Sequence, residues 1–346
     1  MDGLPLLPLR RRIAPTLSLL FLSPLIAEVL SGSTRLRALF VFPIELCVWG
    51  GGALLIRHAV RRFNLGVAAM LVLALALAMA EETVIQQSSL APLVIMLKGE
   101  VYARAFGVNY LYLLWALVYE SVYVVFVPIC LVELIFPGRR DRVWMGKLGV
   151  GVTMFFFAIG SLLAWFAWTH VARVKVFHQP AFVPPAATEV VALAIIAALI
   201  TLAFTTLRGK PIRARHVAPP AARLLAVLGT FWSVLWYGLV VIAFGIAPSL
   251  PPAIPMSAGL LIAAAMLYLL PSWITSTGWT PRHAFCLVVA SVCGLMAVSF
   301  VGFQGPPTAD LYFKAVANVL AVVGLGVLGW RLRRERQRAG NRDAGS

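Results

Sequence analysis

The segment Asn109–Phe136, with the sequence NYLYLLWALVYESVYVVFVPICLVELIF, decides the fold. A helix needs roughly 20 apolar residues to cross a hydrocarbon core of about 30 Å, and this segment is longer than that. Its only charged residues are Glu120 and Glu133. Because a bilayer offers no partner to a free backbone amide, and because the segment lacks the alternation of a barrel strand, we expect a transmembrane helix.

Similar segments recur along the whole chain of 346 residues, of which 61% are hydrophobic and 12% charged, with a mean hydropathy of +0.91. This composition excludes an ordinary soluble domain. We predict an all-α polytopic transmembrane bundle of about ten spans. The expected spans are Ile13–Leu30, Ala38–Ile56, Leu65–Glu82, Asn109–Phe136, Leu148–Val171, Thr188–Leu207, Leu224–Ile246, Met256–Thr277, Ala284–Gly302 and Leu311–Trp330.

The basic residues indicate how the chain threads through the membrane. There are 29 Lys and Arg against 13 Asp and Glu, a formal net charge of +16. They lie in short runs at alternate ends of the spans instead of forming a patch, so the expected partner is the lipid bilayer and not a nucleic acid. Loops that stay in the cytoplasm carry the excess of Lys and Arg, which predicts an inner-membrane protein with both termini cytoplasmic. The runs are Arg10–Arg12, Arg57–Arg62, Arg139–Lys147, Arg208–Arg223, Arg282 and Arg331–Arg342.

Three parts are expected along the chain: residues 1–171 with the first five spans and most of the acidic residues, residues 172–330 with the second five spans, and a basic cytoplasmic tail at 331–346 that we expect to fray. The connection 83–108 contains the apolar run Ala91–Leu97, which is too short to cross the bilayer. It predicts either an interfacial helix or a re-entrant element. Nothing in the sequence indicates an oligomeric state.

Acidic residues gather in the first four spans and their connections: Glu28, Glu45, Glu81, Glu82, Glu100, Glu120 and Glu133. An ionised carboxylate in hydrocarbon costs several kcal/mol, so a glutamate at membrane depth has to be paired, wetted by a cavity or protonated. We therefore propose Glu45, Glu82 and Glu120 as residues that bind a solute or ion, with Tyr123 one turn from Glu120 as a hydrogen-bonding neighbour. The alternative is a neutral glutamic acid bonded to a neighbouring helix in a purely structural role.

Glycines and cysteines add expectations about packing and cofactors. Gly50–Gly52 permits close helix packing or local unwinding. Gly324, Gly326 and Gly329 spell G-x-G-x-x-G, but no strand precedes them, so we predict a flat packing surface and no nucleotide cofactor. The four cysteines lie in apolar segments without C-x-x-C spacing, and we predict no metal site and no cofactor.

The first half resembles a family of uncharacterised bacterial and archaeal polytopic membrane proteins. The resemblance covers roughly residues 20–150 and is carried by Ser23–Ser33, Gly51–Arg57, Glu81-Glu82, Gly107–Tyr110 and Pro128–Pro137. It implies a membrane location and a functional first half without implying a reaction. Members of that family often have a histidine near the middle of the fourth span, where this chain has Tyr119-Glu120.

A weaker resemblance is to the CAAX prenyl-protease and bacteriocin-processing group of intramembrane proteases, whose motifs are Glu-Glu-x-x-x-Arg, Phe-x-x-x-His and a further histidine. Here Glu81-Glu82 is followed by Gln86 in the arginine position, Phe166 to His170 supplies the second motif, and the third is missing. The resemblance implies that Glu81, Glu82 and His170 together activate water.

Three functions are consistent with these residues. The first is binding or transport of a small solute or cation, coupled to protons, through an outward cavity lined by glutamates. The second is an intramembrane protease-like enzyme that uses Glu82 and His170. The third is a structural or assembly role in the membrane.

Overall fold

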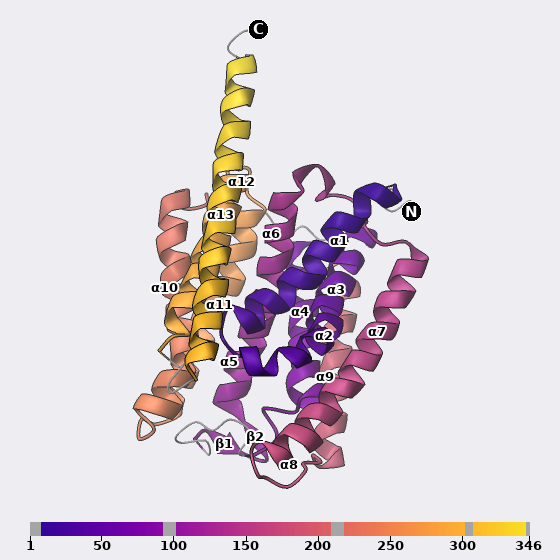
Figure 1. The fold of residues 1–346 in the computed structure, drawn as a ribbon, viewed down its shortest axis with the longest axis vertical. Coiled ribbons are helices and arrows are strands. Elements are labelled where there is room, and N and C mark those ends of the chain that lie inside the picture. The colour runs from indigo at the N-terminus through magenta and orange to yellow at the C-terminus, as the bar shows by residue number, and fades with distance from the viewer. Residues whose placement is uncertain (1–7, 93–101, 209–217, 302–306, 344–346) are drawn as a thin grey trace.

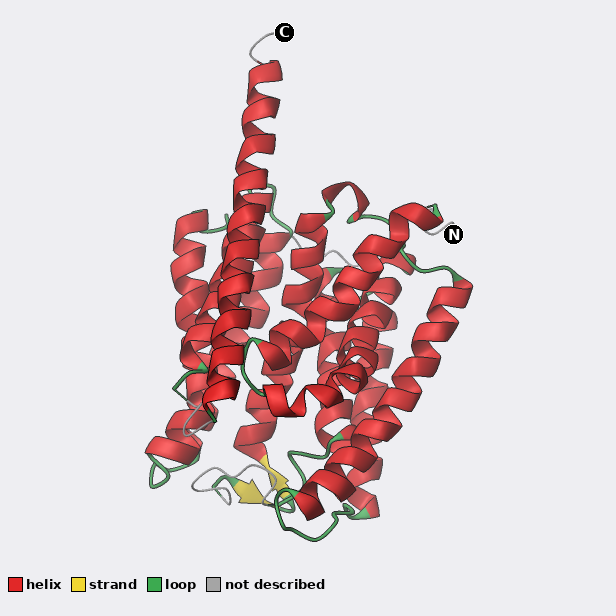
Figure 2. Cartoon of the chain, in the orientation of Figure 1, coloured by secondary structure: helices red, strands yellow, loops and turns green. Residues whose placement is uncertain are grey.

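The computed structural model describes residues 8–92, 102–208, 218–301 and 307–343, and these residues form a bundle of helices with one small hairpin (Figure 2). It has ten helices long and apolar enough to cross a membrane, which confirms the predicted all-α bundle. They are Arg10–Val29, Leu36–Arg62, Val67–Ile85, Tyr110–Ile135, Lys147–Lys175, Ala186–Phe204, Ala222–Ala243, Ala253–Ile274, Pro281–Val298 and Thr308–Glu335. The protein is therefore a multi-pass membrane protein by the length and composition of its helices.

Most spans are built from more than one helical segment. The α-helices are α1 (Leu9–Pro24), α2 (Phe42–Glu45), α3 (Gly51–Arg62), α4 (Val67–Ala80), α5 (Tyr110–Glu120), α6 (Val127–Ile135), α7 (Lys147–Phe166), α8 (Arg173–Lys175), α9 (Ala186–Phe204), α10 (Ala222–Val240), α11 (Ala253–Ile274), α12 (Pro281–Val298) and α13 (Thr308–Asp343). The strands β1 (Arg104–Ala105) and β2 (Val108–Asn109) pair antiparallel.

Several spans also contain π-helical turns, in which a backbone N–H bonds the carbonyl five residues earlier instead of four. These are η1 (Leu25–Val29), η3 (Leu46–Gly50), η4 (Glu81–Ile85), η5 (Ser121–Phe126), η7 (Ala167–Ala172) and η8 (Val241–Ile246). The segments η2 (Leu36–Val41) and η6 (Pro137–Arg139) are 3₁₀-helices.

The start of α1 and the end of α13 lie at the same end of the bundle, and the β1–β2 hairpin lies at the opposite end (Figure 1). An even number of spans requires this arrangement. Helix α13 projects beyond the bundle and stays helical to Asp343. The prediction of a frayed tail was therefore wrong for residues 331–343, because their Arg, Glu, Gln and Ala side chains favour a helix. The predicted element at Ala91–Leu97 lies mostly outside the described residues.

The core lies mainly among the first four spans. Leu19, Ala27, Ala53 and Val132 have no exposed surface. Helix α4 packs against α9, while α10 packs along α12 in the second half. Only 11% of the apolar windows of α7 and α9 is buried, as expected for helices that face lipid.

Two glycines explain how closely the second span approaches its neighbours. A Cβ on Gly50 would lie 2.2 Å from the carbonyl oxygen of Leu20, and one on Gly160 would lie 2.4 Å from the Cβ of Cys47. Gly50 therefore serves close packing, within a π-helical turn.

The packing surface predicted for the last span is found at only one of its three glycines. A Cβ on Gly329 would lie 2.7 Å from the ring of Phe285. A Cβ on Gly324 or Gly326 would meet no described atom within 4 Å. The prediction was wrong for Gly324 and Gly326, because both lie on an exposed face of α13 that contacts no other described helix.

An ion-pair clamp joins the second and fourth spans at the end of the bundle that carries the termini. The guanidinium of Arg57 donates to Glu133 at 3.1 Å and to the carbonyls of Arg140 and Arg142 at 2.7 and 3.2 Å. Arg61 donates to both oxygens of Glu133 at 2.7 and 2.8 Å. Both carboxyl oxygens of Glu133 are therefore occupied by arginines, and Glu133 holds the second and fourth spans together.

Candidate functional site

Five glutamates from the first four spans lie together inside the membrane-spanning part of the bundle. Glu28 lies on η1, Glu45 ends α2, Glu81 and Glu82 begin η4, and Glu120 ends α5. The exposed fractions of Glu45, Glu81, Glu82 and Glu120 are 4%, 2%, 3% and 9%. We call these five residues the glutamate cluster. The structure brings carboxyl groups of four separate spans into one region.

Glu82 and Glu120 form the bonded part of the cluster. The hydroxyl of Ser89 donates to Glu82 Oε2 at 2.5 Å, and the carboxyl groups of Glu82 and Glu120 are hydrogen-bonded to each other. Two carboxyl groups can share a hydrogen bond only if a proton lies between them. A direct bond between Glu82 and Glu120 would therefore require a proton on one of the two carboxyl groups.

Glu81 occupies the centre of the cluster. Its carboxyl group is within electrostatic range of those of Glu82, Glu28 and Glu45. Among the described residues, neither oxygen of Glu81 has a hydrogen-bond partner. Only one carboxyl oxygen of Glu45 has a hydrogen-bond partner within the described part of the chain. Thr34 donates to its Oε1, whereas its Oε2 has no partner there. Buried oxygens of this kind are costly, and they are available to bind a cation or a donor.

The turn after η1 covers the cluster and is held by the last span. The Ser31 hydroxyl donates to the carbonyls of Ala27 and Glu28 at 2.7 and 3.0 Å. The ammonium of Lys314, on α13, donates to the carbonyls of Leu30 and Ser31 at 3.1 and 2.8 Å. Sequence reasoning missed Lys314. The only signal was a lysine one turn inside an otherwise apolar span.

Aromatic residues of α5 and α10 form a wall beside the cluster. Tyr119 stacks on Trp115 with ring centroids 4.7 Å apart, and its hydroxyl donates to the Ala27 carbonyl at 2.6 Å. Tyr112 and Tyr237 are within electrostatic range of Glu28. The spacing of Tyr112, Trp115 and Tyr119 on one helix face was a usable signal for this wall.

The pairing of Tyr123 with Glu120 stays a prediction, and the described contacts of Tyr123 are with other residues. Its ring packs on Tyr119 at 5.0 Å between centroids, and its hydroxyl lies against Ser233 of α10. The described contacts of Glu120 do not include it. The π-helical turn η5 begins directly after Glu120, and such a turn rotates each residue by less than the 100° of an α-helix.

Every member of the glutamate cluster lies in a π-helical turn or directly before one. Glu28, Glu81 and Glu82 are within such turns, while Glu45 and Glu120 immediately precede η3 and η5. Such turns interrupt the regular backbone bonding of a helix and are frequent at functional sites. The glutamate cluster therefore lies where four spans depart from regular α-helix.

His170 has its own partners on η7. Its Nδ1 lies 2.7 Å from the Thr169 hydroxyl, and its ring stacks on Phe166. The described contacts of Glu82 are with Ser89 and Glu120. No described contact joins Glu82 to His170, and the protease-like function stays a prediction. Among the described residues, no group of three or more His, Cys, Asp or Glu has the arrangement of a metal site.

The structure also contains a cavity of about 150 Å³, lined by apolar side chains and two serines. None of the five glutamates lines it. It is therefore distinct from the glutamate-lined outward cavity that the sequence led us to expect.

Comparison with known proteins finds no matching family model, no matching curated protein and no matching solved structure. The class that the fold defines is a multi-pass helical membrane protein with a buried cluster of carboxyl groups. The resemblance of residues 20–150 to a polytopic family stays a prediction.

Proposed function

We propose that the protein binds or transports a small solute or cation in exchange for protons, with the glutamate cluster as the binding site. The observation that carries the proposal is that five glutamates from four spans lie within electrostatic range of one another, four of them buried, with both oxygens of Glu81 unpartnered among the described residues. Residues used only for packing would be expected to have all their polar atoms satisfied.

The electrostatics of the cluster favour an exchange of protons for another cation. Two unit charges 4 Å apart repel by about 4 kcal/mol at an effective dielectric constant of about 20. The five carboxylates of the cluster, four of them buried, therefore cannot all be ionised at once without a cation among them. A cation that enters replaces protons, and protons that return expel the cation, so the two species compete for the same oxygens.

The location and orientation are part of this proposal. The excess of basic residues at the end of the bundle that carries both termini supports an inner-membrane protein with cytoplasmic termini. The glutamates of η4 then lie toward the opposite, outer side.

The test is proton movement in proteoliposomes that contain a pH-sensitive dye. Outward-directed gradients of sodium, potassium or ethylammonium are applied in turn, and we expect at least one of them to drive protons across the membrane. Glu120→Gln should abolish this movement, whereas Glu335→Gln, at a side chain that is 52% exposed on α13, should leave it unchanged.

Two outcomes would contradict the proposal. One is a folded wild-type protein that moves no protons with any of the three cations. The other is undiminished proton movement in Glu120→Gln. If every glutamate of the cluster tolerates glutamine, the structural role is the better explanation.

A further inference from the structure

Glu28 is the member of the glutamate cluster that a ligand can reach. Its side chain is partly exposed, whereas the other four members of the cluster are buried. No hydrogen-bond donor among the described residues contacts its carboxyl group, and its oxygens are not among the atoms that neighbouring groups seal off. A carboxylate without a donor in an apolar setting attracts a cation. Glu28 is therefore the open edge of the cluster.

Tyrosine side chains surround this open carboxyl group. Glu28 is within electrostatic range of the hydroxyls of Tyr112, Tyr119 and Tyr237. Tyr119 is held there because its hydroxyl donates to the carbonyl of Ala27, the residue before Glu28, at 2.6 Å. Tyr112 and Tyr237 are partly exposed, as Glu28 is, and their hydroxyls have no hydrogen-bond partner among the described residues. A ligand at Glu28 therefore meets two tyrosines that still have surface to offer.

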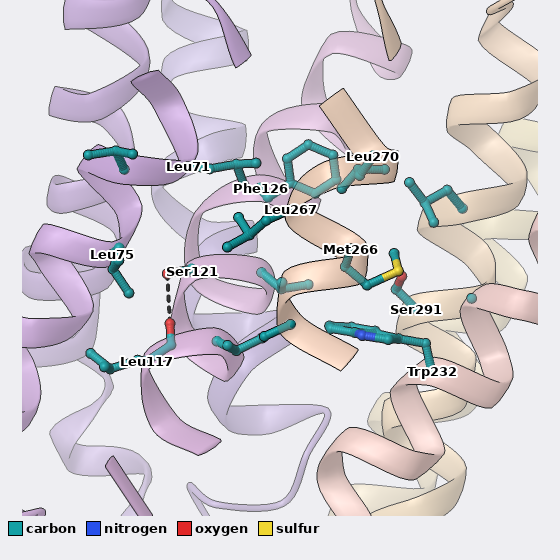
Figure 3. Close-up of a pocket in the computed structure, with 16 residues that line it drawn as sticks. Leu71, Leu75, Leu117, Ser121, Phe126, Trp232, Met266, Leu267, Leu270 and Ser291 are labelled. Atoms are coloured by element: carbon teal, nitrogen blue, oxygen red, sulfur yellow. Dashed lines mark hydrogen bonds between the residues drawn. The ribbon is translucent and has the colours of Figure 1, made fainter. Parts of the chain in front are cut away.

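These tyrosines and Trp115 form one continuous aromatic surface made by α5 and α10. The centroid of the Trp115 six-membered system lies 5.6 Å from that of Tyr112 and 4.7 Å from that of Tyr119. It lies 5.7 Å from that of Tyr237, which belongs to α10. An aromatic face attracts a cation within about 6 Å of its centroid and also packs against apolar groups. None of these four residues lines the apolar cavity shown in Figure 3.

The buried part of the cluster next to Glu28 offers acceptors that need a donor. Glu81 is within electrostatic range of Glu28, is 2% exposed and has no partner for either oxygen among the described residues. The described carboxyl groups do not have the arrangement of a metal site. A primary ammonium carries three N–H donors and makes charge-assisted hydrogen bonds with such oxygens. The site thus combines acceptors for an ammonium with an aromatic surface for a carbon chain.

We propose that the ligand of the glutamate cluster is a protonated primary amine. Its ammonium donates to Glu28 and Glu81, and its carbon chain packs on the rings of Tyr112, Trp115 and Tyr237. An alkali ion has neither a chain to pack on these rings nor an N–H to donate. This inference rests on the proposed function, because it names the chemical class of the cation that exchanges with protons.

The experiment is equilibrium dialysis of the full-length protein in detergent micelles against radiolabelled ethylammonium, with other cations as competitors. We expect the dissociation constant of ethylammonium to be at least tenfold lower than those of sodium and potassium. Tetramethylammonium is the test of the donors, because it packs on aromatic rings but has no N–H. It should also bind at least tenfold more weakly than ethylammonium.

The variants separate the carboxyl group from the rings. Glu28→Gln should weaken the binding of ethylammonium at least tenfold. Tyr237→Leu, which removes a ring, should weaken it at least fivefold, whereas Tyr237→Phe, which keeps the ring, should bind within twofold of the wild type. The matched control is Tyr312→Leu, at a side chain on α13 that is 67% exposed, which should leave binding unchanged. Circular dichroism and gel filtration show whether each variant is folded.

Each contrary result has a distinct meaning. Sodium or potassium binding as tightly as ethylammonium overturns this inference and leaves the proposed exchange of cations for protons intact. Equal binding of tetramethylammonium overturns the assignment of a primary amine. Equal binding in Tyr237→Leu and Tyr312→Leu overturns the aromatic contact. Binding of ethylammonium by a protein that moves no protons with any cation in proteoliposomes overturns the proposed function instead.

Discussion

Replacing Glu81 with methionine should stabilise the folded protein and at the same time abolish proton movement. Glu81 is 2% exposed, and neither of its oxygens has a hydrogen-bond partner among the described residues. Methionine has a similar length, fills the same space and has no group that needs a strong hydrogen bond. The substitution also removes one member from a cluster of like-charged groups.

The size of the effect follows from these contacts. A buried polar group without a partner costs about 1–3 kcal/mol, so Glu81→Met should raise the free energy of unfolding by about 2 kcal/mol. Glu82→Met should do the opposite. It removes the bonds to Ser89 and Glu120 and leaves both partners unsatisfied, which should lower the free energy of unfolding by about 2–4 kcal/mol.

The assay is unfolding in detergent micelles by titration with a denaturing detergent, followed by circular dichroism, with flux measured in parallel in liposomes. Two adjacent glutamates should thus shift the midpoint in opposite directions while both variants lose proton movement. If Glu81→Met destabilises the protein as much as Glu82→Met, then Glu81 has structural partners and the reasoning fails. A stabilised Glu81→Met that keeps full flux would instead remove Glu81 from the binding site.

Two further predictions concern how the cluster is held in place. Lys314→Met removes the ammonium that bonds two carbonyls of the turn after η1. It should speed hydrogen exchange of the backbone at residues 30–34 and lower the free energy of unfolding by about 2 kcal/mol. Unchanged exchange there would contradict this role. Gly50→Ala should lower the melting temperature in detergent because its Cβ would lie 2.2 Å from the Leu20 oxygen. Gly151→Ala is the control, since its Cβ would meet no described atom within 4 Å, and it should leave the melting temperature unchanged. Equal melting temperatures for the two variants would count against the close approach at Gly50.

The sequence was sufficient to predict the spans and to select two glutamates that the structure buries. Runs of apolar residues determine which segments enter a bilayer, and these runs can be read directly from the residues. Glu45 and Glu120 stand within predicted apolar spans, which is why the sequence singles them out. The structure brings these two residues into the same buried region.

The composition of the site was harder to predict because it depends on which spans become neighbours. Glu81 and Glu28 belong to different spans, and no local pattern shows that their carboxyl groups approach each other. Lys314 reaches the first span from the last one, across a sequence separation of more than 280 residues. A periodic pattern within one helix carries no information about such contacts.

The geometry around Tyr123 could not be predicted from periodicity for a different reason. The prediction assumed a regular α-helix through Glu120, and the structure has a π-helical turn at Ser121–Phe126. The apolar residues of that stretch are compatible with either kind of helix in a bilayer. The choice is made by tertiary packing, which sequence periodicity does not report.

The π-helical turn in the fourth span also lets its two ends be aligned independently. Glu120 on one side of η5 must meet Glu82, and Glu133 on the other side must meet Arg57 and Arg61. An unbroken α-helix would fix the angle between these two glutamates by their spacing alone. The extra residue in η5 corrects that angle. Deleting one residue there would therefore break either the approach of Glu120 to Glu82 or the ion pairs of Glu133 with Arg57 and Arg61.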